Sequence, residues 1–411
     1  MMIFLNTVFI VGAIFLLKNR IPKYDSYVNH LSIFSGVWIV ITIGSQLSYG
    51  DFVSPESVLL FYACLYCYIL GSSILSFAKF KESSMQEYNI GRIRVIVFLL
   101  VVLCIIANWD IIDEVFFNFR SILDLAIMRQ KKEYSQLDES NIFKAIFQRA
   151  YLIYIPLTMF LYKKKKAHLV FLILAIISGI LLSLSKFTRG PFMHVLLVTG
   201  IVYTYLYRKK ISIKLVVIIV SSVFLIFGIT TSFLFEASGN FKGSILESTQ
   251  IYIFGGQLSF QDIMYGRYVD NRFYDSPYYS LDNINYILER FEIIDTYPNY
   301  VRNWSTTHIF TNTYTYLDCY YLDFGLPGVL IGSCFSGFIS DSAYYAMKKY
   351  RYNIYNIIFY GYVCFYNMII FSNNEFMKFS SLLPMVILLV INFFSKNVSG
   401  KDDQNSILLQ N

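Results

Sequence analysis

The chain has 411 residues, of which 56% are hydrophobic and only 15% are charged. A soluble globular domain carries about 25% charged residues, so this composition excludes a soluble protein and indicates a membrane protein. The formal net charge of +7 does not indicate nucleic acid binding, because the basic residues form short clusters between apolar runs rather than one patch.

Apolar runs that could cross a bilayer recur from one end of the chain to the other. A spanning helix needs about 20 predominantly apolar residues. By this measure the sequence predicts an all-α polytopic membrane protein with about eleven transmembrane helices. The runs lie near residues 2–17, 31–50, 57–78, 93–108, 145–162, 167–185, 192–207, 214–235, 319–343, 353–372 and 379–395.

Clusters of lysine and arginine occupy every second connection between these runs. The clusters lie at residues 18–23, 79–94, 163–166, 208–214, 348–351 and 396–401. Because the cytoplasmic loops of membrane proteins are enriched in Lys and Arg, we expect these connections on the cytoplasmic side. The N-terminus is then expected outside and the C-terminus in the cytoplasm.

The first of two long outer connections covers residues 109–144. Within it Ile112, Phe116 and Phe119 recur at helical spacing and predict an amphipathic helix on the outer side. Such a helix could pack over the bundle or act as a lid, and the sequence leaves both alternatives open.

The second long outer connection, residues 236–318, follows helices 1–8 (residues 1–235) and precedes helices 9–11 with a cytoplasmic tail (residues 319–411). It is rich in tyrosine and also contains arginines. These include Arg267, Arg272 and Arg302. Tyrosine rings stack on sugar faces and guanidinium groups pair with phosphate oxygens, so we expect this loop to bind sugars and phosphates.

A short turn between the sixth and seventh runs places two cations, Lys186 and Arg189, on the side that is otherwise poor in them. Either these side chains reach out to lipid phosphates or they form a fixed cationic site for an anionic substrate group. His194 follows within the seventh run. By itself it is more typical of a hydrogen-bonded core histidine.

The end of the large loop contains the other residues that could act chemically. His308 could serve as a base or hydrogen-bond donor near neutral pH, with Asn312 close behind it. Asp323 lies within a predicted spanning helix, where a carboxylate is costly unless it is paired. Asp323 could bind substrate, or it could cap a turn. Gly325 and Pro327 permit a break in the helix beside it.

Signatures of metal or nucleotide chemistry are missing from the sequence. It contains neither a phosphate-binding loop nor an H-E-x-x-H motif, and its histidines are scattered. Cys64 and Cys67 form a C-x-x-C inside a predicted spanning helix, where redox chemistry lacks polar partners and access. We therefore expect no metal and no cofactor, and a substrate that arrives already activated.

Three stretches resemble the Wzy family of O-antigen polymerases of bacterial inner membranes. Residues 188–191 resemble the family's outer-face arginine turn, with Arg189 and Gly200 at an R-x10-G spacing. Residues 252–260 resemble a glycine-containing segment that follows the eighth helix, and residues 307–328 are similar to the H-N…D-F-G-x-x-G end of the large loop.

The sequence departs from the family pattern in two places. Arg302 is followed at the R-x10-G spacing by Thr313 rather than by glycine, so a scheme with two arginine motifs is not carried over. Ile309 stands where asparagine often follows the histidine, and Asn312 could replace that asparagine.

The resemblance implies a glycosyltransferase that polymerises undecaprenyl-pyrophosphate-linked oligosaccharide repeat units into O-antigen or a related surface polysaccharide. It implies a multi-pass protein of the bacterial inner membrane, with a periplasmic N-terminus. Arg189 and His308 are then the expected catalytic residues. The expected substrate-binding residues are Lys186, Arg267, Arg272, Arg302, Asn312 and Asp323. The expected partners are lipid-linked glycans, membrane lipids and a chain-length regulator of the same pathway.

Other functions stay open at this point. An O-antigen ligase would show similar arginines and a histidine. A cell-wall polymerase of the SEDS type is a further alternative, although its loop aspartate motif is not found in this sequence. A flippase for lipid-linked oligosaccharides is a transporter, and it predicts charge inside the bundle together with short loops. The apolar runs of this sequence are nearly free of charge, which favours the enzyme.

Overall fold

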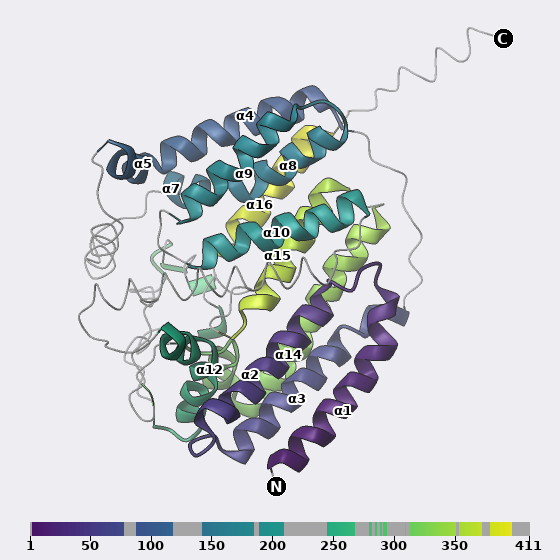
Figure 1. The fold of residues 1–411 in the computed structure, drawn as a ribbon, viewed down its shortest axis with the longest axis vertical. Coiled ribbons are helices and arrows are strands. Elements are labelled where there is room, and N and C mark those ends of the chain that lie inside the picture. The colour runs from purple at the N-terminus through teal and green to yellow at the C-terminus, as the bar shows by residue number, and fades with distance from the viewer. Residues whose placement is uncertain are drawn as a thin grey trace, which may run out of the picture.

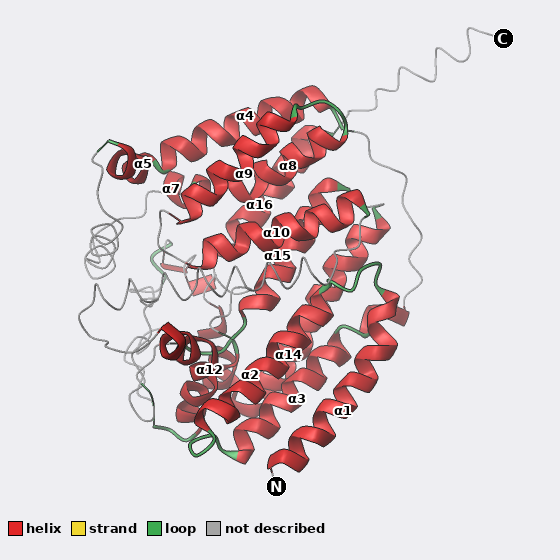
Figure 2. Cartoon of the chain, in the orientation of Figure 1, coloured by secondary structure: helices red, strands yellow, loops and turns green. Residues whose placement is uncertain are grey.

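The computed structural model describes residues 2–77, 88–117, 142–184, 189–208, 245–267, 279–281, 284–285, 288–289, 291–293, 309, 313–350, 353–371 and 379–396. Over these residues the chain is helical, and its β-structure is limited to an isolated bridge between Tyr88 and Lys396 (Figure 2).

The helices follow one another along the chain. The α-helices are α1 (Met2–Arg20), α2 (His30–Tyr49), α3 (Pro55–Gly71), α4 (Ile90–Ala107), α5 (Trp109–Phe116), α7 (Ile142–Phe147), α8 (Tyr151–Lys163), α9 (Leu169–Leu184), α10 (Arg189–Tyr207), α12 (Ile245–Met264), α14 (Leu317–Lys349), α15 (Ile354–Ile369) and α16 (Phe379–Ser395). Short 3-10 helices are η1 (Ile21–Lys23), η2 (Ile74–Phe77) and η3 (Tyr279–Leu281).

The predicted apolar runs coincide with described helices, except for the run at 214–235, which lies outside the described residues. The run at 145–162 is divided between α7 and α8. Among the described residues, four helices are long and apolar enough to cross a membrane, and their segments are Phe4–Lys23, His30–Tyr49, Ile90–Ala107 and Leu317–Lys349. The helical class and multi-pass character are therefore supported, and the count of eleven stays a prediction.

Side-chain caps explain where several helices begin. Asn29 accepts from the backbone N–H of Ser32, and Ser32 in turn accepts from the Asn29 N–H, which forms a capping box at the start of α2. Ser54 caps α3, and Asn89 caps α4. Because these caps satisfy otherwise unpaired N–H groups, the polar residues between the apolar runs fix the helix boundaries.

The helices pack around two hydrophobic cores. One core is formed mainly by α4, α8, α9, α10, α15 and α16, and the other by α1, α2, α3, α12 and the first half of α14. Figure 1 shows α15 where the two groups adjoin, with α10 on one side and α14 on the other. Glycines allow α3 and α14 to approach closely, since a Cβ at Gly71 would meet the Cys334 carbonyl and one at Gly337 would meet the Tyr68 carbonyl.

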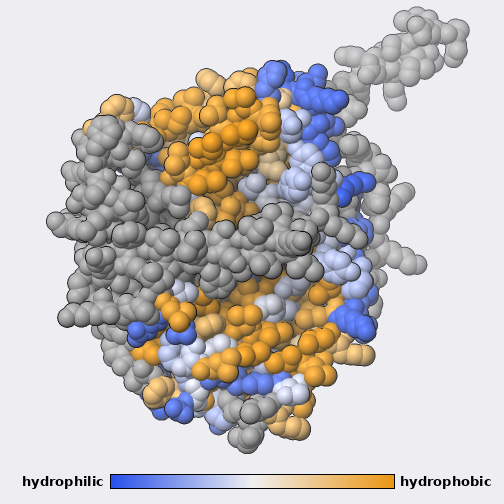
Figure 3. All heavy atoms as spheres, in the orientation of Figure 1, coloured by the Kyte–Doolittle hydropathy of each residue, from blue (hydrophilic) through white to orange (hydrophobic). Residues whose placement is uncertain are grey.

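The lysines and arginines of these clusters that the structure describes gather at one end of the bundle, which we call the basic end. There Arg94 donates to the Lys166 carbonyl, and Lys163 donates to the Leu206 carbonyl. Figure 3 shows hydrophilic residues along this edge. We call the opposite end, where α3, α8, α10 and α14 begin, the far end. The predicted alternation of basic connections therefore corresponds to a grouping of these connections in space.

Large apolar side chains cover the outward surfaces of several helices. Phe4 on α1 is 74% exposed, Phe98 on α4 is 67% exposed and Phe393 on α16 is 72% exposed. Figure 3 shows broad apolar areas on this face of the molecule. Surfaces of this size are not stable against water, so we interpret them as the face toward lipid.

Candidate functional site

The site begins with the alignment of α8 and α10, which lie side by side. Lys163 on α8 donates to the carbonyl of Leu206 on α10, and these positions are 43 residues apart in the sequence. Both helices end at this contact and run in the same direction, so Tyr151 and His194 lie in the halves toward their common other end. The beginnings of both helices therefore meet at the far end of the bundle.

Arg149 precedes α8 at this far end. The turn that holds it is fixed by Asn108 at the end of α4, whose side-chain amide donates to the Gln148 carbonyl at 3.1 Å. Arg149 lies within electrostatic reach of Tyr151, His194 and Tyr362. It forms no ion pair with a carboxylate of the described residues. A guanidinium group is thus held half-buried beside polar side chains of three helices.

His194 is buried and packed between aromatic rings of α15. Its ring stacks on Phe365, with centroids 3.8 Å apart and an interplanar angle of 5°, and it meets the edge of Tyr362 at 4.7 Å. Its Nε2 has no hydrogen-bond partner among the described residues. The prediction that His194 is buried is confirmed, whereas the expected hydrogen bond at Nε2 is absent there.

The hydroxyl groups of Tyr151 and Tyr362 are also buried and have no hydrogen-bond partner in the part of the chain that the structure describes. Folded proteins pair nearly all buried polar groups, because each unpaired one costs about 1–3 kcal/mol. Such groups also occur singly elsewhere among the described residues, but here three of them gather around one guanidinium. We call Arg149, Tyr151, His194 and Tyr362 the far-end cluster.

The chemistry of the far-end cluster suits an anion with several oxygens. Hydroxyl groups, an imidazole N–H and a guanidinium all donate hydrogen bonds, and a guanidinium pairs well with phosphate oxygens. Arg189 is the first residue of α10, so the positive end of that helix points to the same region. The arrangement can hold a phosphate or pyrophosphate at the far end.

Asp323 lies on the first part of α14 and connects it to the predicted large loop. Its carboxylate oxygens accept from the backbone N–H of Tyr279 at 2.7 Å and of Ser280 at 2.6 Å, and also from the Ser280 hydroxyl. With these donors in place, Asp323 orients a turn of the loop. This geometry corresponds to the capping alternative.

The predicted break in α14 is confirmed directly after Asp323. Gly325 has a φ of +63°, which interrupts the helical backbone and which glycine adopts without strain. A Cβ at Gly328 would meet the Tyr320 carbonyl, so the chain packs tightly on both sides of the break. The Gly and Pro residues here therefore position Asp323 against the loop.

Arg267 follows α12, whose Phe260 is fully buried in the second core. Its guanidinium lies 5.1 Å from the centre of the Tyr265 ring, and the Tyr265 hydroxyl donates to Glu56 at 3.1 Å. Arg267 is exposed at the far end. Arg267 and Asp323 lie on elements of the second core, whereas the far-end cluster belongs to the first.

Several predicted site residues cannot be placed. Lys186, Arg272, Arg302, His308 and Asn312 lie outside the described residues, and only the backbone of Arg189 is described. Most of the predicted amphipathic segment, at 118–141, also lies outside them. Their proposed roles stay predictions from the sequence.

Sequence reasoning missed Arg149. It stands inside the predicted run at 145–162, on the side of the membrane that is otherwise poor in cations. The second of these criteria had selected Lys186 and Arg189, which lie in the turn between two runs. An ionisable residue within a spanning segment is a functional hypothesis by default, so the signal was present.

A second polar cluster, near the basic end, was also missed. Asp341 on α14 is fully buried, accepts from the Tyr24 hydroxyl at 2.9 Å and lies 3.7 Å from Nε2 of His30. The Tyr360 hydroxyl accepts from the His30 backbone N–H and contacts its Nδ1, both at 3.0 Å. We call Tyr24, His30, Asp341 and Tyr360 the basic-end cluster.

The basic-end cluster corrects the prediction that the helix interiors are nearly free of charge. Burial, followed by the charge of Asp341, raises the pKa of Tyr24, so this hydroxyl stays protonated and donates to the carboxylate. The Asp341 carboxylate and the His30 imidazole lie 3.7 Å apart and connect α14 with α2.

The described residues hold no group of histidine, cysteine and acidic side chains that could bind a metal ion. All six cysteines are free thiols, including Cys64 and Cys67. Comparisons with protein-family models, with curated proteins and with solved structures find no match. The resemblance to the Wzy family stays a prediction from the sequence motifs.

Proposed function

We propose that this chain is a membrane glycosyltransferase that polymerises undecaprenyl-pyrophosphate-linked oligosaccharide repeat units at the outer face of the bacterial inner membrane. The observation that carries the proposal is the far-end cluster, in which Arg149 lies near three buried polar groups that have no hydrogen-bond partner among the described residues. The arginine turn that resembles the Wzy family also suggests pyrophosphate binding at Arg189, the first residue of α10.

The orientation of the bundle supports this location. Basic residues collect at the end opposite to the far-end cluster, and the positive-inside rule assigns that end to the cytoplasm. The far-end cluster then belongs to the periplasmic half. An undecaprenyl chain would extend into the bilayer along the apolar surface, with its pyrophosphate at the membrane boundary.

The reaction transfers a growing glycan from its lipid carrier to a new lipid-linked repeat unit. A hydroxyl oxygen of the acceptor sugar bonds to the anomeric carbon of the donor, and the bond from that carbon to the pyrophosphate oxygen breaks. The electron pair leaves with undecaprenyl pyrophosphate, and a base takes the hydroxyl proton. His308 is the proposed base.

Arg149 and Arg189 would stabilise the charge that develops on the leaving pyrophosphate. Donors fixed in a site that excludes water act strongly, because the low dielectric increases their interaction and they need no rearrangement. Tyr151, His194 and Tyr362 would complete the hydrogen bonds to its oxygens. Asp323 would position the loop turn at Tyr279 and Ser280, which brings the sugar-binding loop to α14.

The test is the glycan ladder of a strain that lacks the gene, restored with wild-type or variant protein. We expect Arg189→Ala to abolish chain extension while the protein still accumulates in the membrane. Arg189→Lys should restore it only in part, because an ammonium lacks the bidentate fork. Full-length glycan from the Arg189→Ala strain would overturn the proposal.

The same gel separates the alternatives. Loss of a polymerase leaves lipid A core with a single repeat unit, whereas loss of an O-antigen ligase leaves core with none. A flippase is favoured by one observation, the buried Asp341 beside His30. Its loss would also leave core without a repeat unit, and lipid-linked units would accumulate on the cytoplasmic leaflet.

A further inference from the structure

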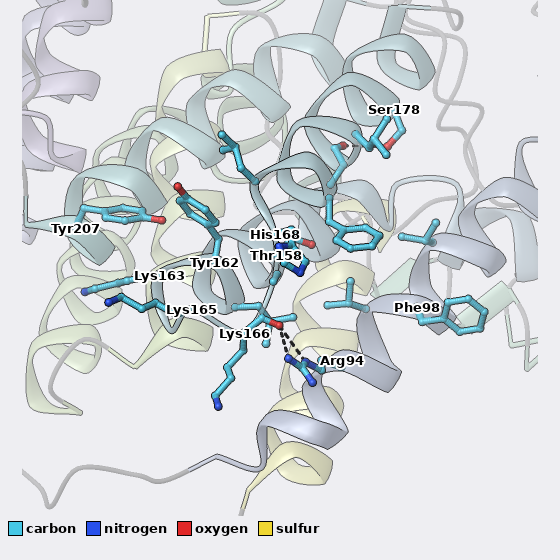
Figure 4. Close-up of a pocket in the computed structure, with 18 residues that line it drawn as sticks. Arg94, Phe98, Thr158, Tyr162, Lys163, Lys165, Lys166, His168, Ser178 and Tyr207 are labelled. Atoms are coloured by element: carbon cyan, nitrogen blue, oxygen red, sulfur yellow. Dashed lines mark hydrogen bonds between the residues drawn. The ribbon is translucent and has the colours of Figure 1, made fainter.

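A cavity of about 1220 Å³ lies near the basic end between α4, α8 and α9, away from the far-end cluster. Figure 4 shows the side chains that line it. Phe98, Phe171 and Leu174 form an apolar wall, and all three are more than half exposed on the surface that we interpret as facing lipid. The cavity is therefore a groove that opens toward the bilayer.

The mouth of the groove is basic. Lys163, Lys165, Lys166 and His168 lie there, with Arg94 on the neighbouring helix (Figure 4). Two of these cations hold the walls together, since Arg94 donates to the Lys166 carbonyl and Lys163 donates to the Leu206 carbonyl. Lys165 and Lys166 are exposed and form no ion pair within the described residues.

The turn that ends α8 keeps these lysines in place at a conformational cost. The Lys166 N–H donates to the Leu161 carbonyl and the Lys165 N–H to the Tyr162 carbonyl, both at 2.9 Å, which is the Schellman arrangement. Lys165 has a φ of +56° at the position where glycine is usual. A lysine at a left-handed position suggests that its charge has a role.

We propose that this groove binds an anionic diacyl phospholipid. Its phosphate would lie at the basic mouth lined by Lys165, Lys166 and His168, and an acyl chain would follow Phe98 and Phe171. Basic pockets between transmembrane helices on the cytoplasmic side suit such head groups. The groove opens onto the leaflet at the basic end, whereas the proposed polyprenyl substrate would bind at the opposite end, so the occupant is a bulk lipid.

The experiment is native mass spectrometry of the full-length protein in detergent, titrated separately with dioleoylphosphatidylglycerol and dioleoylphosphatidylcholine. We expect phosphatidylglycerol to bind at least about tenfold more tightly, since each lysine near an anionic lipid contributes about 1 kcal/mol. Equal binding of the two lipids would overturn the proposal.

Variants then locate the site. Lys165→Gly combined with Lys166→Ala removes both free charges, and glycine suits the left-handed backbone, so we expect a folded protein that has lost the tenfold preference. Lys18→Ala combined with Lys23→Ala is the matched control, because both lysines are exposed at the same end without a described ion pair. An equal loss in the control would show general charge attraction and overturn the site.

A third titration uses undecaprenyl phosphate. We expect this lipid to bind more weakly than phosphatidylglycerol. We also expect the Lys165→Gly and Lys166→Ala changes to leave its affinity unchanged. If it instead displaces phosphatidylglycerol and depends on those lysines, the groove is a site for a polyprenyl carrier and the assignment to a phospholipid is wrong.

Discussion

The two polar clusters of the bundle use the same kinds of side chain in opposite ways. Each contains a buried histidine beside tyrosines, and α15 contributes Tyr360 to one and Tyr362 to the other. In the basic-end cluster both tyrosine hydroxyls are hydrogen-bonded, and His30 Nε2 lies 3.7 Å from Asp341 although it and the second Asp341 oxygen form no hydrogen bond. In the far-end cluster neither tyrosine hydroxyl nor the histidine Nε2 has a hydrogen-bond partner among the described residues.

This difference separates scaffold from site better than burial does. Paired buried polar groups lock helices together, and unpaired ones cost stability unless a ligand uses them. We therefore interpret the basic-end cluster as structural and the far-end cluster as the place where substrate binds. The predictions below test that contrast.

The largest effect is expected from Arg149. Arg149→Ala removes the guanidinium that the structure describes beside the three unpaired groups, and it should lower glycan extension at least about 100-fold, in line with the loss of one preorganised electrostatic donor. Arg149→Lys should retain a part of the activity. Ladder length relative to protein in the membrane measures both. A normal ladder from Arg149→Ala would remove the far-end cluster from the reaction.

Asp341 should behave in the opposite way. Asp341→Ala leaves Tyr24 and His30 without their acceptor, so it should lower the free energy of unfolding by about 3 kcal/mol, as for a broken buried pair. Thermal unfolding in detergent measures this change. Glycan extension per folded molecule should stay near the wild-type value. Lost extension with unchanged thermal stability would reverse the roles of the two clusters.

The tyrosines of α15 provide a matched pair of hydroxyl deletions. Tyr360→Phe removes the contacts to His30 and should destabilise the protein by about 1 kcal/mol without loss of activity. Tyr362→Phe removes an unpaired hydroxyl, so stability should hold while extension falls about tenfold, the value of one hydrogen bond to a charged oxygen. Identical behaviour of the two variants would abolish the distinction.

The smallest effect concerns the loop turn at Ser280. Ser280→Ala removes the hydroxyl donor to Asp323 but keeps both backbone donors, so the turn should loosen by about 1 kcal/mol or less. A loss of about 1 kcal/mol raises the population of the open turn about fivefold, so limited proteolysis near Tyr279 should become up to about fivefold faster. Asp323→Ala removes the acceptor of all three hydrogen bonds, so it should accelerate this cleavage more than Ser280→Ala does. Unchanged cleavage in Asp323→Ala would show that other contacts hold the turn.

The sequence predicted the helices well because apolar runs and basic clusters are local properties. It also predicted the break at Gly325, since glycine and proline act on the backbone where they stand. It did not predict that Asp323 accepts from Tyr279 and Ser280, because that contact depends on how the loop returns to α14.

The two clusters lay beyond sequence reasoning for a related reason. Tyr24 and Asp341 are 317 positions apart, and only the packing of α14 against α3 and the segment after α1 brings them together. Arg149 was visible as a cation in an apolar run, but its neighbours Tyr151, His194 and Tyr362 come from three helices. Single residues carry no information about which hydroxyl groups remain unpaired.

The central claim is that this chain transfers a glycan from undecaprenyl pyrophosphate to a lipid-linked repeat unit, with the leaving group held at the far-end cluster. The most direct measurement incubates the purified protein with lipid-linked repeat units and follows glycan length and free undecaprenyl pyrophosphate together. The account predicts that one undecaprenyl pyrophosphate is released for each repeat unit added, and that Arg149→Ala slows both equally. Lengthening without release, or no lengthening from protein that restores the ladder in cells, would contradict it.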